Sequence, residues 1–63
     1  MSDFTVHDHG SLALVYVNTD GALLWAREHL SEQTQWFGQA FAVEPRYLAT
    51  ILDVIIEEGF DIQ

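Results

Sequence analysis

The stretch QWFGQAFAV, residues 35–43, decides the fold of this chain. Its side chains alternate with the period of a β-strand, which places Phe37 and Phe41 on one side and Trp36 on the other. We therefore expect a single strand over residues 35–43, with Gly38 marking a bulge or a close approach by another backbone. In that strand Phe37 faces the core, and Trp36 faces the opposite surface.

Two strands are expected before this stretch. Residues 3–8 alternate between apolar and polar side chains, and residues 11–17, SLALVYV, are apolar on both faces. A strand that is apolar on both faces is typical of the middle of a sheet. Gly10 between the two strands can take a positive φ, so we expect an antiparallel hairpin.

Two helices are expected around the stretch. The first covers residues 20–30, and Asn18, Thr19 and Asp20 are all suitable N-caps. The second begins at Pro45, whose missing N–H is tolerated in the first turn, and Gly59 suits its C-terminal cap. Its apolar stripe is the clearest in the chain and consists of Leu48, Ile51, Leu52 and Ile55, widened by Tyr47 and Ile56. Residues 60–62 then suit a short edge strand.

The expected fold class is α+β, a small β-β-α-β-α(-β) domain with a three- or four-stranded sheet and two helices on one face. Helices on one face leave the other face open, and an exposed apolar face usually marks a partner surface. The residues that we expect at such an interface are Trp36, Ala40, Val15, Val17 and Trp25.

The chain has 63 residues, which fits a single domain over residues 1–63. A domain of this size is only marginally stable, so a dense core or an oligomer is expected, and a homodimer is the simplest case. There is no cysteine, no signal-peptide pattern and no apolar run long enough to cross a bilayer. We therefore expect a cytoplasmic protein.

Charge excludes some functions. Ten acidic residues stand against two arginines, and the net charge of −8 disfavours direct binding to nucleic acid or to anionic membranes. The same charge attracts partners with a basic surface, including nucleic-acid enzymes that an acidic mimic would inhibit. The simpler interpretation is that acidity keeps a small protein in solution.

Few residues suggest chemistry. His7, Asp8 and His9 form the densest polar cluster, and the two histidines share a strand face, but zinc needs three or four ligands. No nucleophile motif or phosphate-binding loop is present. We expect no enzymatic activity and no cofactor. The alternative is a metal-binding or small hydrolytic domain centred on this cluster.

Several short motifs lie in a fixed order along the chain: HGS at 9–11, QWFG at 35–38, VEPRY at 43–47 and EEGF at 57–60. Together they resemble a group of short proteins of proteobacterial genomes, plasmids and phages that have no assigned activity. The resemblance implies a self-contained bacterial or mobile-element domain with a regulatory or inhibitory role, and it assigns no functional residue.

These observations favour a non-enzymatic protein–protein interaction module. Its expected partner is a second copy of the chain or a protein with a basic surface.

Overall fold

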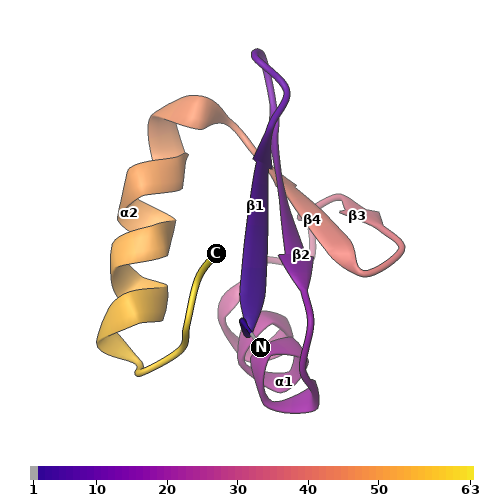
Figure 1. Ribbon diagram of the computed structural model, residues 1–63. Helices are drawn as coiled ribbons and strands as arrows, with labels where there is room; N and C mark the ends of the chain where they lie inside the picture. The colour runs from indigo at the N-terminus through magenta and orange to yellow at the C-terminus, as the bar shows by residue number, and fades with distance from the viewer. Residues whose placement is uncertain (1) are drawn as a thin grey trace.

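The computed structural model describes residues 2–63 and arranges them in six elements. In chain order these are β1 (Phe4–Asp8), β2 (Ala13–Val17), α1 (Asp20–His29), β3 (Trp36–Phe37), β4 (Ala40–Val43) and α2 (Pro45–Glu57). The strands form one antiparallel sheet in the order β1-β2-β4-β3, and both helices pack on the same face of it (Figure 1). The expected α+β class is confirmed, with a four-stranded sheet.

The first hairpin forms as expected. β1 and β2 pair from Phe4 opposite Val17 to Asp8 opposite Ala13. Gly10 turns the chain with a φ of 85°, and its N–H donates to Oδ1 of Asp8 over 2.8 Å. β2 also pairs with β4, so it is the central strand that its two apolar faces indicate.

The expectation of one strand over residues 35–43 is wrong. The chain reverses at Gly38, and β3 pairs with β4 so that Trp36 lies opposite Phe41 and Phe37 opposite Ala40. Gly38 has a φ of 64°, whereas no non-glycine residue within residues 2–63 has a positive φ. That pattern fits a two-residue type II′ turn, which takes glycine at its first central position and matches the twist of the flanking strands. Gly38 is therefore a turn residue and not a bulge.

Local sequence explains both helices. α1 begins after Thr19, whose hydroxyl oxygen accepts a hydrogen bond from the N–H of Ala22 over 3.2 Å. α2 begins at Pro45, as its fixed φ favours. α2 ends in a Schellman motif, because Gly59 has a φ of 91° and its N–H and that of Phe60 donate to the carbonyls of Ile56 and Ile55.

The core lies between the sheet and the helices. Its buried members are Phe4, Val15, Val17, Ala22, Trp25, Ala26, Phe41, Val43 and Ile55. α2 contributes only one fully buried side chain, Ile55. Tyr47 and Ile56, expected to widen the buried stripe, are 52% and 59% exposed, so that expectation is wrong. The short sheet shares its covered face between two helices and accommodates only the centre of the stripe of α2.

Residues 60–62 do not form the edge strand that was expected, but the end of the chain still pairs with the β1 edge of the sheet. Ile62 forms a parallel bridge with Phe4, and Gln63 exchanges backbone hydrogen bonds with Phe4 and Val6 at 2.9 and 3.1 Å. The carboxylate of Asp3 accepts from the N–H of Asp61 over 3.0 Å and so ties the two ends of the chain together. Within residues 2–63, neither helix has the length and apolar character that crossing a bilayer requires.

Candidate functional site

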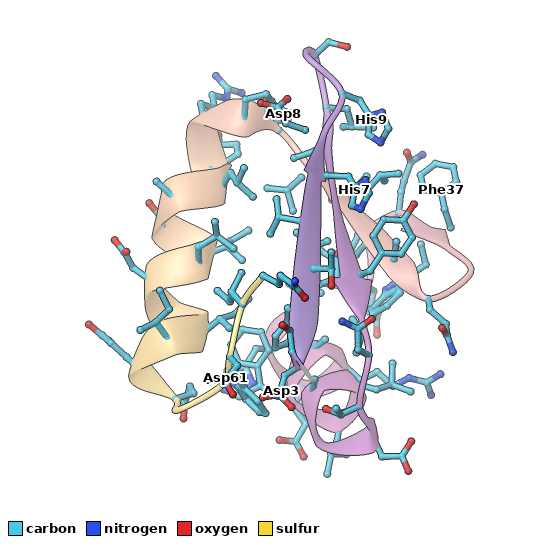
Figure 2. All side chains as sticks on the ribbon, viewed as in Figure 1. Asp3, His7, Asp8, His9, Phe37 and Asp61 are labelled. Atoms are coloured by element: carbon cyan, nitrogen blue, oxygen red, sulfur yellow. The ribbon has the colours of Figure 1, made fainter. Side chains whose placement is uncertain are left out.

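The face of the sheet turned away from the helices is the candidate site. Strand pairing assigns it seven side chains, which we call the open face: Thr5, His7, Leu14, Tyr16, Phe37, Ala40 and Ala42. In Figure 2, His7 and Phe37 project from the side of the sheet opposite α2. All four strands contribute, so this surface depends on the whole sheet and not on one loop.

Aromatic side chains give the open face its character. Phe37 is 56% exposed, although large apolar side chains normally lie inside a protein. The rings of His7 and Tyr16 meet edge to face, with their centroids 5.1 Å apart. These rings span the face from β1 to β3 and form a patch of the kind that usually marks an interaction site.

The open face is also free of formal charge. Its strand residues include no Asp, Glu, Lys or Arg, although the chain carries a net charge of −8. The one acidic strand residue, Asp8, pairs with Ala13 and belongs to the other side of the sheet. The open face therefore contains no carboxylate, which lowers the cost of removing water from it.

The five residues expected at an interface are not on the exposed surface that was predicted for them. Val15, Val17 and Trp25 are buried in the core. Trp36 is half-buried and lies edge-on against Phe41 at a centroid distance of 5.5 Å.

Ala40 is the one member of that set on the open face, but only 1% of it is exposed, since Tyr16 and Phe37 flank it in the sheet. Val15 and Val17 thus lie on the face of β2 that the helices cover, and not on its exposed face.

Phe37, an exposed ring of the open face, was expected in the core instead. A two-residue turn changes which residues share a face: Trp36 joins Phe41, and Phe37 joins Ala40. The signal for this arrangement is the pair Gly38-Gln39 between two apolar stretches, because glycine followed by another residue is the sequence of a type II′ turn. The turn was not predicted because the alternation typical of a strand continues through residues 35–43.

Trp25 connects the two helices to the sheet. Its indole stacks on the ring of His29 at 4.7 Å and meets Phe4 and Phe60 edge to face. The indole N–H is buried and has no hydrogen-bond partner among the atoms of residues 2–63. An unpaired buried donor is destabilising, so apolar packing must outweigh that loss.

The cluster of His7, Asp8 and His9 does not form a metal site. The histidine rings are stacked with centroids 6.3 Å apart, whereas Asp8 holds the turn through Gly10. Within the described part of the chain, no group of three or more His, Cys, Asp or Glu residues is placed to bind a metal. The two histidines alone are too few ligands for zinc.

The cleft beside Trp36 contains few groups suited to catalysis. It measures about 480 Å³ and is lined by Leu23, Arg27, Trp36, Gly38 and Gln39. Arg27 is its one ionisable side chain, so the cleft lacks the acid–base pair or activated nucleophile on which hydrolysis depends.

Comparison of the chain with protein-family models, curated proteins and solved structures gives no match.

Proposed function

We propose that this protein is a non-enzymatic interaction module that self-associates through the open face of its sheet, as a cytoplasmic homodimer. One observation carries the proposal: a four-stranded sheet presents an uncharged face with Phe37 56% exposed, in a chain of net charge −8. Burying that face against a second copy removes apolar surface from water without burying a carboxylate.

A second copy is the occupant that this face favours. A basic partner would gain nothing from a face without carboxylates, whereas an uncharged aromatic face is complementary to itself across a two-fold axis. The molecule measures 27 × 22 × 18 Å, and a standard interface takes about 800 Å² from each partner. Nearly the whole open face would therefore take part in the interface. We expect a weak dimer whose population depends on protein concentration.

Salt dependence distinguishes self-association from binding to a basic partner. Two copies of a chain with net charge −8 repel each other, and added salt screens that repulsion. The dimer is therefore expected to strengthen with salt. Attraction to a basic protein weakens under the same conditions.

The test is sedimentation equilibrium over a wide range of protein concentration, at low and high salt. The wild-type chain is expected to shift from 7.2 kDa toward twice that mass. Phe37→Glu should abolish the shift, because it places a carboxylate within the interface. Leu24→Glu is the matched control, since Leu24 is 61% exposed and lies on α1, away from the open face.

Phe37→Ala is expected to weaken the dimer without abolishing it. Burying a phenylalanine side chain completely is worth about 1.5–3 kcal/mol, so burying the exposed half of Phe37 is worth about 1–1.5 kcal/mol in each copy. Losing both weakens the dimer by about 2–3 kcal/mol, or roughly 30- to 140-fold. A mass of 7.2 kDa at every concentration and salt, or equal effects of Phe37→Glu and Leu24→Glu, would overturn the proposal.

A further inference from the structure

α2 has more apolar surface than the sheet can cover. Its polar residues, Arg46, Thr50, Asp53 and Glu57, follow one another at intervals of four, three and four and form one narrow stripe. The rest of the helix is apolar, yet Ile55 is its only fully buried residue. Val54 and Tyr47, which lie beside the stripe, are 40% and 52% exposed.

Part of this uncovered surface lines a groove between the two helices. It has a volume of about 210 Å³ and is lined by Trp25, His29, Leu30, Thr50, Ile51 and Val54. A second hollow of about 440 Å³ shares Leu30 and Ile51 with it and extends to Tyr47 at the start of α2. That second hollow is also lined by polar residues, Ser31, Gln33, Thr34 and Glu44. The name helix groove is therefore kept for the apolar groove between α1 and α2, whose lining includes no residue of the open face.

Acidic side chains border the helix groove. On a helix, residues three apart are neighbours, so Glu28 lies next to Trp25 in α1 and Glu57 lies next to Val54 in α2. By the same spacing Arg27 and Arg46 are neighbours of Leu30 and Thr50, but neither arginine lines the groove. The guanidinium of Arg46 is 2.9 Å from the carboxylate of Glu44, and Arg27 lines the separate cleft beside Trp36.

We propose that the helix groove binds a basic amphipathic helix of another protein. The apolar side of that helix would lie over Val54, Ile51 and Leu30, and its lysines or arginines would meet the acidic border. A second copy of this chain does not fit, because its own helices would bring carboxylates toward carboxylates. An anionic lipid surface is excluded on the same charge argument.

The test uses a synthetic helical peptide of leucine and lysine with apolar residues at i, i+3, i+4 and i+7. The protein variant is Trp36→Phe, which leaves Trp25 in the groove as the sole fluorescent indole. Binding is expected to change the emission of Trp25 and to give a saturable curve. A peptide of the same composition in scrambled order carries the same charge and controls for unspecific attraction to the acidic protein.

Two substitutions on one helix test the location. Val54→Lys adds a cation inside the groove, and Ile56→Lys adds the same cation at a site that is 59% exposed and outside the groove lining. Val54→Lys is expected to weaken binding roughly tenfold more than Ile56→Lys, the loss typical of a central interface contact. If circular dichroism shows that Val54→Lys does not fold, Val54→Thr is compared with Ile56→Thr, which tests the same two positions with a small polar side chain.

Equal affinity for the scrambled peptide, or equal effects at positions 54 and 56, would overturn the groove proposal. Phe37→Glu separates this proposal from the proposed dimer, because it disrupts the open face and leaves the helix groove intact. It should bind the peptide like the parent protein. The groove and the dimer can therefore fail separately.

Discussion

The turn at Gly38 gives the sharpest test of the fold, because the chirality of one atom is enough to probe it. Gly38 has a φ of 64°, a conformation that L-residues disfavour and D-residues favour. The chain of 63 residues is short enough for chemical synthesis, so either L-alanine or D-alanine can be placed at position 38. The two products have the same composition and differ only in handedness.

The expected difference follows from the turn geometry. A β-carbon of L configuration at Gly38 has no neighbour within 4 Å, so steric contact with the rest of the molecule contributes nothing. Both alanines restrict the unfolded chain equally, so that contribution of about 0.4–1 kcal/mol cancels between them. What remains is the conformational strain of an L-residue at positive φ, about 1–2 kcal/mol. D-alanine should therefore give the more stable protein by this amount.

Thermal unfolding followed by circular dichroism measures the difference. For a domain of this size 1 kcal/mol shifts the midpoint by about 4–8 °C, so the two proteins should differ by about 4–16 °C. Gly21→Ala is a control for the general effect of replacing glycine, because Gly21 lies in α1 and has no positive φ. It should stabilise the protein by about 0.5–1 kcal/mol.

Equal midpoints, or a more stable L-alanine protein, would refute the hairpin. A more stable L-alanine protein would mean that position 38 has an ordinary extended backbone, as in a single strand over residues 35–43. Phe37 would then belong in the core, and the open face would lose this exposed ring. The proposed dimer therefore depends on this measurement.

Three further predictions concern stability. Ile55→Val should lower the free energy of unfolding by about 0.5–1.5 kcal/mol in urea titrations, because Ile55 is fully buried, whereas Ile56→Val at an exposed site should stay within about 0.5 kcal/mol. Thr19→Ala should lose about 1 kcal/mol and Thr19→Ser should retain most of it, since the hydroxyl is the N-cap of α1; equal losses would exclude the cap. Removing residues 61–63 should increase thioflavin binding and light scattering, because it leaves the edge of β1 unpaired; an unchanged signal would mean that this edge is protected without them.

The sequence allowed most elements to be predicted because their signals are local. The hairpin of β1 and β2, the start of α2 at Pro45 and its end at Gly59 each depend on residues within one turn of the chain. The α+β class follows from these elements alone. The hairpin at Gly38 was missed because strand periodicity continues through QWFGQAFAV whether or not the chain turns.

The sequence predicts that an open face exists, but it does not predict which residues form that face. An open apolar face follows from having two helices on one side of a small sheet, but which side of β2 they cover is a tertiary choice. Both faces of β2 are apolar, so its own pattern does not distinguish Leu14 and Tyr16 from Val15 and Val17. The partners of those residues decide: Thr5 and His7 are polar neighbours on the open side, whereas Phe4 and Phe41 lie on the covered side.

The tie between the two ends of the chain has a consequence for folding kinetics. Asp3 and Asp61 are 58 positions apart, so their contact closes nearly the longest loop available to the chain. Loops of that length close slowly and give no benefit until both ends are in place. We therefore expect the bridge between Phe4 and Ile62 to form after the transition state. Substitutions at Ile62 should then accelerate unfolding and leave the folding rate unchanged. The contact that forms last would therefore determine how long each molecule stays folded.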